Sequence, residues 1–155
     1  MMWKKFIISI SVPLLAGFIG SFFTFGSIDS WYSGLNKPVF SPPNWLFGPV
    51  WTILYVLMGI SVYLIWRKLE KNEKVRSAFI FFWVHLFFNA IWSIIFFGLQ
   101  SPVLALVDIV IIWLMILMMI IWYWKIEKWS SILLWPYIIW VSFASVLNLS
   151  IVMLN

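Results

Sequence analysis

Five long runs of apolar residues, each able to cross a lipid bilayer, constrain this chain more than any other feature. A helix crosses the hydrocarbon core of about 30 Å with about 20 residues. The runs cover residues 6–25, 45–66, 78–99, 103–124 and 129–154. The chain is 65% hydrophobic and 10% charged, and a water-soluble domain cannot hide that much apolar surface. The sequence therefore predicts an all-α integral membrane protein, in which residues 1–155 form a single bundle of five transmembrane helices.

The basic residues are unevenly distributed among the connections between these runs. In a five-span chain, the N-terminus shares one side of the membrane with the second and fourth connections. Nine of the ten Lys and Arg residues lie on that side: Lys4, Lys5, Arg67, Lys68, Lys71, Lys74, Arg76, Lys125 and Lys128. Only Lys37 lies on the other side. Because cytoplasmic segments carry an excess of Lys and Arg, we predict a cytoplasmic N-terminus, with the first loop and the C-terminus outside.

The first run begins like a secretory signal, with two lysines before an apolar stretch. That stretch is longer than the apolar core of a signal, which has about 7–15 residues, so we interpret it as a retained helix. It contains two pairs of small residues at a spacing of four, Ala16 with Gly20 and Gly17 with Ser21. Such pairs let helices approach closely in lipid.

The loop of residues 26–44 and the segment after it are rich in proline and aromatic residues. Four of the seven prolines lie between Trp31 and Tyr55: Pro38, Pro42, Pro43 and Pro49. Proline fixes its own φ and favours an extended residue before it, so Lys37, Ser41 and Gly48 are expected outside ordinary helix. Pro49 is expected in the first turn of the second helix. So stiff a loop can cover a pocket as a lid, or it is a surface connection with interfacial aromatic residues.

Polar and tryptophan side chains inside the apolar runs are candidates for function, because polar groups are costly in lipid. On the third run, one helical face carries His85, Asn89 and Trp92. On the fifth run, one face carries Trp140, Ala144, Leu147 and Asn148. Of the 13 tryptophans, four lie too deep for the interfacial belt: Trp51, Trp92, Trp113 and Trp140.

Ordinary packing explains several of these polar residues equally well. Asn89 and Asn148 can form hydrogen bonds between helices without touching a ligand. A lone His85 is more often a packing residue than a ligand. Asp108 in the fourth run is expected inside the bundle or near its end, because a carboxylate facing lipid is costly. We expect structural roles for Asp108 and Asn148.

The sequence lacks the signatures of several enzyme classes. It contains no cysteine, which excludes disulfides, thiolate metal sites and cysteine nucleophiles. It also contains no HExxH, GxSxG, Walker or GxGxxG motif. One histidine and one deep aspartate cannot form a metal site by themselves, so we expect no metal and no obligatory cofactor. Any reactive species would then be the ligand, positioned by aromatic side chains.

A set of short motifs is spread over nearly the whole chain. The motifs are Trp31-Tyr32, Leu35-x-Lys37-Pro38, Pro42-Pro43, Pro49-x-Trp51, Leu54-Tyr55, Asn89-x-x-Trp92, Asp108 and Pro136-Tyr137-x-x-Trp140-x-x-Phe143-Ala144-x-x-Leu147-Asn148. Together they resemble the translocator protein family, also called the tryptophan-rich sensory protein or peripheral benzodiazepine receptor family. The resemblance implies a bundle of five helices, commonly a homodimer, with a pocket under the first loop. It also implies a bacterial member in the inner membrane.

The resemblance implies the ligands as well. They are porphyrins such as protoporphyrin IX, sterols, and drugs of the isoquinoline carboxamide and benzodiazepine types. Bacterial members resemble tetrapyrrole binders, with light-dependent breakdown of protoporphyrin attributed to some. By matched position, Trp51 and Trp140 would flank the ligand and carry any chemistry. The other residues predicted to contact it are Tyr32, Pro42, Phe47, Asn89, Trp92, Ala144 and Leu147.

One departure from the family concerns sterols. Animal members end in a cholesterol-recognition motif of the form Leu/Val-x-Tyr-x-Lys/Arg. After Leu147 this chain reads Asn-Leu-Ser-Ile-Val-Met-Leu-Asn, with no tyrosine and no basic residue. The sequence therefore does not favour a sterol partner. We expect no nucleic-acid partner either.

Two functions from different classes remain open at this point. The first is a membrane protein that binds a tetrapyrrole and oxidises it in the light, because a flat apolar porphyrin suits a cavity lined by tryptophan. The second is a transporter or regulatory partner protein, for porphyrins or other apolar ligands, with no chemistry of its own.

Overall fold

Helices dominate the computed structural model, which describes residues 2–70 and 72–155. The described part of the chain contains six α-helices, one 3₁₀ turn and one π-helical turn. They are α1 (Met2–Ile28), η1 (Tyr32–Gly34), α2 (Asn44–Trp66), α3 (Glu73–Ser93), η2 (Ile94–Gly98), α4 (Pro102–Ile126), α5 (Lys128–Ile132) and α6 (Trp135–Leu154). No strand occurs among these residues.

Five helical segments are long and apolar enough to span a membrane, which confirms the predicted number of spans. Their ends differ from the predicted ends by a few residues, and the third span ends in the π turn η2. The fifth span is broken between α5 and α6, where Pro136 stands in the first turn of α6. Proline has no N–H to donate to the preceding turn, and a helix tolerates it best at its start. One of the nine basic residues, Lys71, lies outside the described residues.

The expected position of Pro49 was wrong. We expected Gly48 outside ordinary helix and Pro49 in the first turn, but α2 begins at Asn44, and both residues lie within it. Proline removes one backbone hydrogen bond there. The turn before it is still held in place, because Leu46 N donates to Pro43 O and the ring of Phe47 packs on Trp140. Tertiary packing thus overrides the local preference.

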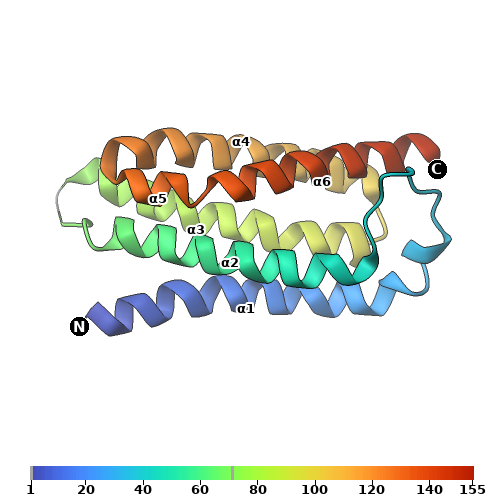
Figure 1. The fold of residues 1–155 in the computed structure, drawn as a ribbon, viewed down its shortest axis with the longest axis horizontal. Coiled ribbons are helices and arrows are strands. Elements are labelled where there is room, and N and C mark those ends of the chain that lie inside the picture. The colour runs from blue at the N-terminus through green and yellow to red at the C-terminus, as the bar shows by residue number, and fades with distance from the viewer. Residues whose placement is uncertain (1, 71) are drawn as a thin grey trace.

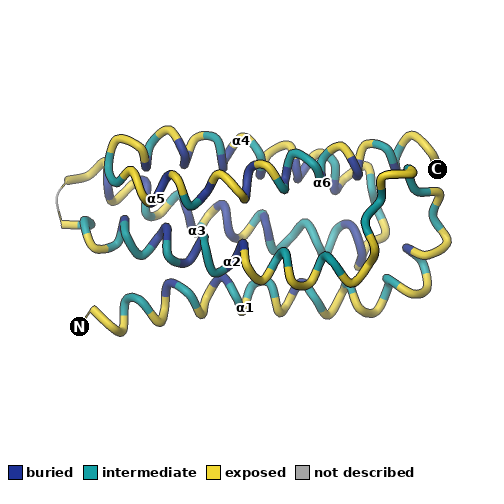
Figure 2. The backbone as a smooth tube through the Cα atoms, viewed as in Figure 1, coloured by how far each residue is buried: buried dark blue, intermediate teal, exposed yellow. Residues whose placement is uncertain are grey.

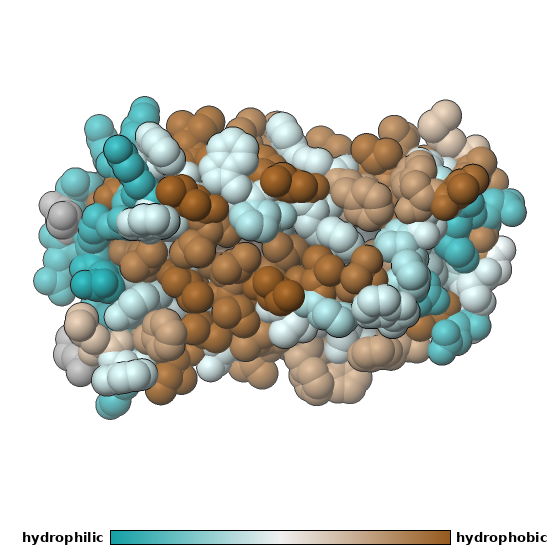
Figure 3. All heavy atoms as spheres, in the orientation of Figure 1, coloured by the Kyte–Doolittle hydropathy of each residue, from teal (hydrophilic) through white to brown (hydrophobic). Residues whose placement is uncertain are grey.

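The helices run side by side along one long axis, with the two termini at opposite ends of the bundle (Figure 1). Helix α1 packs against α2 and α3, while α4 packs against α3, α5 and α6. Buried residues face the inside of the bundle and exposed residues face outward along most helices (Figure 2). On the face shown in Figure 3, hydrophobic side chains predominate in the middle, and hydrophilic ones gather toward the two ends. This pattern suits a bundle surrounded by lipid.

Small residues of α1 and α2 allow the close approaches that the sequence suggested. A Cβ atom on Gly17 would lie 2.2 Å from the ring of Tyr55, and one on Gly20 would lie 3.1 Å from the hydroxyl of Ser93. A Cβ atom on Gly59 would lie 2.7 Å from the backbone oxygen of Ser9. These glycines bring α1 against α2 and α3, where the candidate site lies.

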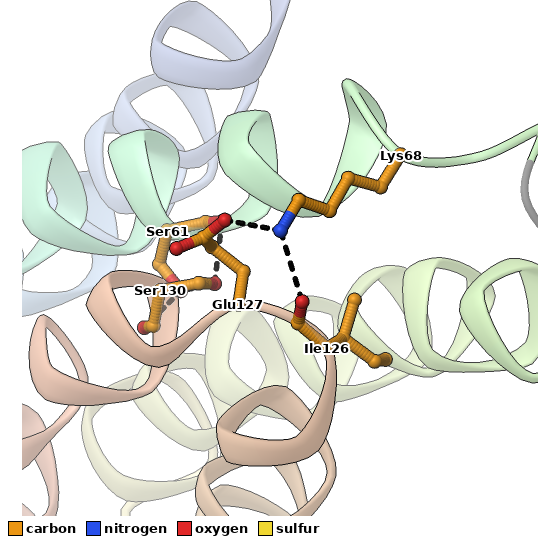
Figure 4. A network of polar contacts seen from close by, with 5 residues as sticks. All are labelled: Ser61, Lys68, Ile126, Glu127 and Ser130. Atoms are coloured by element: carbon orange, nitrogen blue, oxygen red, sulfur yellow. Dashed lines mark hydrogen bonds and ion pairs between the residues drawn. The ribbon is translucent and has the colours of Figure 1, made fainter.

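Polar contacts join α2 to α4 and α5 at the end of the bundle that holds the N-terminus (Figure 4). Ser61 and Ser130 are both fully buried, and the hydroxyl of each donates to the backbone oxygen of the other at 2.8 and 2.7 Å. Nearby, Lys68 forms an ion pair with Glu127 and donates to the backbone oxygen of Ile126 at 3.0 Å. These contacts hold the short α5 helix against α2.

Candidate functional site

A cavity of about 880 Å³ extends from the loop end of the bundle toward its middle. Its walls come from α1, η1, α2, α3, η2, α4 and α6, so segments from nearly the whole chain meet there. The volume lies within the range of about 300–1,000 Å³ that is usual for small-molecule sites. Most of the lining is apolar or aromatic.

The wall formed by α1 and the start of α2 is open to the outside of the bundle. Leu15, Phe18 and Phe25 of α1 line the cavity yet are exposed, as is Trp45 of α2. In contrast, the lining residues of α4 and most of those of α6 are buried. The cavity is therefore accessible from the lipid-facing side, between α1 and α2.

Eight of the nine residues predicted to contact a ligand lie in the walls of this one cavity. They are Tyr32, Phe47, Trp51, Asn89, Trp92, Trp140, Ala144 and Leu147. Pro42 is not among the described residues that line it, and ligand contact at Pro42 stays a prediction. The structure thus brings the predicted set together from the loop, α2, α3 and α6. Contact with a ligand remains a prediction for all nine.

The two tryptophans predicted to flank a ligand lie on different helices and in different aromatic clusters. The ring of Trp51 on α2 lies 5.7 Å from that of Tyr55 and 6.2 Å from that of Tyr137, measured between centroids. The ring of Trp140 on α6 lies 6.1 Å from that of Phe47. Such aromatic contacts add to the free energy of burial and fix the orientation of the indoles.

A chain of buried hydrogen bonds lies behind these rings and joins α2, α3 and α6. The hydroxyl of Tyr55 donates to Asn89 Oδ1 at 2.6 Å, and Asn89 Nδ2 donates to the hydroxyl of Tyr137 at 2.7 Å. That hydroxyl also lies 2.9 Å from His85 Nε2. Tyr55 and Asn89 line the cavity, whereas Tyr137 and His85 are fully buried behind it. This supports the packing interpretation of both Asn89 and His85.

The proline-rich loop is fixed to the end of α6. The backbone N–H of Asn36 donates to Asn155 Oδ1 at 2.9 Å, and Asn155 Nδ2 donates to Asn36 O at 3.0 Å. Within the loop, Lys37 donates to the backbone oxygen of Tyr32 at 2.8 Å. Tyr32 is 2% exposed, and burial raises the pKa of its hydroxyl above the usual value of 10.0. The loop thus supplies a buried neutral side chain to the cavity wall.

The remaining polar residues of the membrane spans have different surroundings. Asp108 is 6% exposed, so it lies inside the bundle as predicted, but it is not among the described residues lining the cavity. Asn148 lines the cavity and donates to the backbone oxygen of Pro102 at 2.8 Å, which ties α6 to the start of α4. Trp113 lies outside the cavity and donates to Ser142 at 2.8 Å.

Several lining residues were not identified from the sequence. Tyr55 follows Trp51 by one helical turn, and that spacing could have indicated a shared face. The residues of α1 that line the cavity recur at intervals of three or four, as do Leu14, Phe18 and Ser21. The π turn η2, which places Phe96 and Phe97 in the wall, left no signal in the sequence.

Chemically, the site is an apolar cavity with few polar groups. Among residues 2–70 and 72–155, no group of three or more His, Asp or Glu side chains could hold a metal ion. The polar groups of the wall include the side chains of Tyr55, Asn89 and Asn148, and each already forms a hydrogen bond within the protein. The site therefore suits a large apolar ligand, held by aromatic rings and burial.

Comparison with known proteins agrees with these features. The sequence pattern of the TspO/MBR family matches residues 9–154. A tryptophan-rich protein TspO of Archaeoglobus fulgidus is 45% identical over 152 residues, which cover 97% of each chain. A protein of the same name from Chlorobaculum tepidum is 42% identical, over 94% of this chain and 92% of its own. The human translocator protein is 36% identical, over 88% of this chain and 81% of its own. The chain therefore belongs to the TspO/MBR family of membrane proteins.

Proposed function

We propose that this chain binds a tetrapyrrole such as protoporphyrin IX in the cavity and breaks it down in the light. The observation that carries this proposal is a single cavity of about 880 Å³ with aromatic walls, into which five membrane spans and the first loop contribute. A flat, largely apolar macrocycle gains free energy from burial and from stacking on aromatic rings. The exposed wall between α1 and α2 gives such a ligand a path from the lipid.

The chemistry in this proposal belongs to the ligand and two indoles. A porphyrin excited by light accepts an electron from a nearby indole, which becomes an indole radical cation. Trp51 and Trp140 are the donors, since they line the cavity from two different helices. The porphyrin radical anion then passes its electron to molecular oxygen, so the porphyrin returns to its neutral state, the oxygen becomes superoxide and the indole stays one electron short. Superoxide and molecular oxygen are the oxidants that would break down the macrocycle.

Related properties belong to the same proposal. The cavity would also accept drugs of the isoquinoline carboxamide and benzodiazepine types, which are compact and aromatic. The protein would act as a homodimer in the inner membrane of a bacterial cell, with the first loop serving as a lid. Neither property is needed for the cavity to bind a tetrapyrrole.

The alternative is a transporter or regulatory partner protein that binds the same ligands without chemistry. The exposed wall between α1 and α2 also suits this function, because a carried ligand must enter and leave. Light separates the two functions. Chemistry consumes the porphyrin in the light, and binding alone shifts its spectrum without consuming it.

The test is illumination of the purified protein with protoporphyrin IX, followed by its main absorption band, indole fluorescence and the products. We expect Trp51→Phe and Trp140→Phe to weaken binding by about 1 kcal/mol or less, because phenylalanine keeps much of the ring area. Porphyrin breakdown should fall much further, because it requires the oxidisable indole. Trp129→Phe is the matched control, since Trp129 is exposed and lies outside the cavity.

Two results would contradict the proposal. Spectral shifts without any new product would favour the binding function without chemistry. Breakdown at the parent rate in both cavity variants would show that these indoles take no part in it.

A further inference from the structure

The buried pair Tyr137–His85 has no part in the function proposed above, yet its geometry suits a redox-active tyrosine. The hydroxyl of Tyr137 on α6 lies 2.9 Å from Nε2 of His85 on α3, and both side chains are fully buried. The same hydroxyl accepts a hydrogen bond from Asn89 Nδ2 at 2.7 Å. A phenol loses an electron readily only when its proton can leave with it, so the partner of the hydroxyl decides whether such a tyrosine can be oxidised.

The hydrogen bonds define which atom holds the proton. The Tyr137 oxygen already accepts from Asn89, so its own proton is free to point at His85 Nε2, which accepts as a neutral imidazole nitrogen. In that tautomer only the Nδ1 proton of His85 has no hydrogen-bond partner among the described residues. The opposite tautomer would have Nε2 donate, and it would leave both the phenol proton and the Nδ1 lone pair without a partner there. A buried hydroxyl without a partner is costly. Tyr137 is therefore the donor.

Other buried tyrosines lack such a base. The hydroxyl of Tyr55 donates to Asn89 Oδ1, and that of Tyr123 donates to the backbone oxygen of Ala78 at 3.3 Å. An imidazole nitrogen is a much stronger base than an amide oxygen, so it can take up the proton of a phenol that is losing an electron. Among these three tyrosines, only Tyr137 combines an imidazole partner with a ring 6.2 Å from that of Trp51.

We propose that Tyr137 and His85 form a redox pair that returns an electron to Trp51 after Trp51 has been oxidised. This inference rests on the proposed function only for its oxidant, a photoexcited porphyrin, which takes one electron from the Trp51 indole. Tyr137 then passes one electron to the indole radical cation. The O–H bond of Tyr137 breaks as its proton forms an N–H bond at His85 Nε2. The products are a neutral indole, a neutral tyrosyl radical and an imidazolium.

The charges balance at every step. The positive charge of the indole radical cation reappears on His85, and the electron moves the opposite way over the short distance between two packed rings. No net charge enters the bundle interior, where a new isolated charge would be costly. Trp51 is restored and can serve again, while the unpaired electron resides behind the cavity wall, away from the ligand.

The test does not require a porphyrin. Near-ultraviolet flashes absorbed by indole oxidise tryptophan in the ligand-free protein, and electron paramagnetic resonance distinguishes tyrosyl from indole radicals. We expect Tyr137→Phe to remove most of the tyrosyl signal. In His85→Gln, the new side chain can still accept a hydrogen bond but cannot act as a base. We expect the tyrosyl signal to appear about a hundredfold more slowly in this variant, as for loss of a general base. Tyr123→Phe is the matched control, because it also deletes one buried phenol hydroxyl.

The outcomes are distinct. The chain has five tyrosines, so a tyrosine with no special role would contribute about one fifth of the tyrosyl signal. If Tyr137→Phe lowers that signal by one fifth or less, that result would overturn the proposed redox pair. An unchanged rate in His85→Gln would do the same. If either variant fails to fold by circular dichroism, the parent protein produced in heavy water replaces it, and radical transfer should slow there. An equal rate in light and heavy water contradicts the proposal.

Failure of the proposed function would look different. Radical transfer to Tyr137 without any porphyrin breakdown by the parent protein would support the pair and contradict the light-dependent chemistry. Porphyrin breakdown without a tyrosyl radical would support the chemistry and contradict the pair.

Discussion

Asn89 illustrates how one residue can line a cavity and still form hydrogen bonds between helices. Its position on the third span suggested either a ligand contact or a hydrogen bond between helices. In the structure, Asn89 lines the cavity, but its Oδ1 accepts from Tyr55 and its Nδ2 donates to Tyr137. An amide has two donors and two acceptor lone pairs, so one of each remains for a ligand. Its established contacts are structural, and they orient the aromatic residues around Trp51.

Ala144 leaves the space on the α6 side of the cavity that a bulky ligand needs. We expect Ala144→Phe to weaken porphyrin binding at least about fivefold, because a ring in place of a methyl group fills the cavity and overpacking costs about 1–3 kcal/mol. The affinity is measured by adding protoporphyrin to the protein and following the quenching of its indole fluorescence. Val146→Phe is the control, since Val146 is two residues away and exposed on the outer face of α6. Equal affinity in the two variants would place the ligand elsewhere.

At Gly59, helix α2 lies directly against the backbone of α1. A Cβ atom there would lie 2.7 Å from Ser9 O and 2.8 Å from the Cα of Ile10, and backbone atoms cannot move aside cheaply. We expect Gly59→Ala to lower the free energy of unfolding in detergent by about 1–3 kcal/mol. In Gly26→Ala the new methyl group meets nothing within 4 Å, and stability should stay equal or rise by up to about 1 kcal/mol. A Gly59→Ala protein as stable as the parent would contradict this packing.

At the scale of elements, the interrupted fifth span depends on contacts made beyond the apolar region. The ion pair between Lys68 and Glu127, together with the paired serines Ser61 and Ser130, holds α5 against α2 (Figure 4). The hydrogen bond from Lys68, aided by its charge, lowers the pKa of Glu127 below the ordinary value of 4.5.

This lowered pKa predicts a dependence of stability on pH. A carboxyl group whose pKa is lower in the folded state contributes stability above its unfolded pKa and loses it as the pH falls through the folded value. We expect thermal unfolding in detergent to show a stabilising contribution of Glu127 at neutral pH that disappears in acid, below about pH 4.5. The contribution is small, because the pair is partly solvated. Glu127→Gln is the comparison. If its melting temperature differs from that of the parent by the same amount at neutral pH and in acid, the predicted pH dependence is contradicted.

The π turn η2 and the break before α6 are the two elements that shape the cavity without being visible in the apolar pattern. The π turn closes with the hydrogen bond from Leu99 N to Ile94 O at 2.8 Å. It is followed by Gln100, whose φ of 52° lies in the left-handed region. Such π turns often occur at functional sites, and here the turn directs Phe96 and Phe97 toward Tyr32.

For the whole molecule, the orientation in the membrane is the prediction that most affects function. We expect single cysteines at Ser33 and Glu70, both exposed and in a chain without cysteine of its own, to react with impermeant reagents from opposite sides. Glu70 is preferable to its neighbour Asn72, because Asn72 caps α3 by accepting from Val75 N. From the excess of Lys and Arg on its side, Glu70 is expected in the cytoplasm. Labelling of both cysteines from one side would contradict the five-span topology.

Length and apolar composition were enough to predict the helical class and the number of spans, and the sequence motifs named eight of the residues that line the cavity. Membrane spans can be recognised from length and apolar composition alone, because every backbone polar group in lipid must be paired within its own helix. Trp51 and Trp140 could be singled out because tryptophans so deep in a span have no interfacial role to explain them.

How these parts combine depends on contacts between helices that no single span reveals. The tertiary structure placed Pro49 inside α2, because packing of Phe47 on Trp140 holds the turn before it. It joined His85 to Tyr137, from spans whose sequences carry no sign of one another. The spacing of residues along one span indicates which face of that helix is buried. Cavities and hydrogen-bonded partners, in contrast, arise where several helices meet. Their positions depend on which side chains fill the space between them, and that is settled only when all five spans pack together.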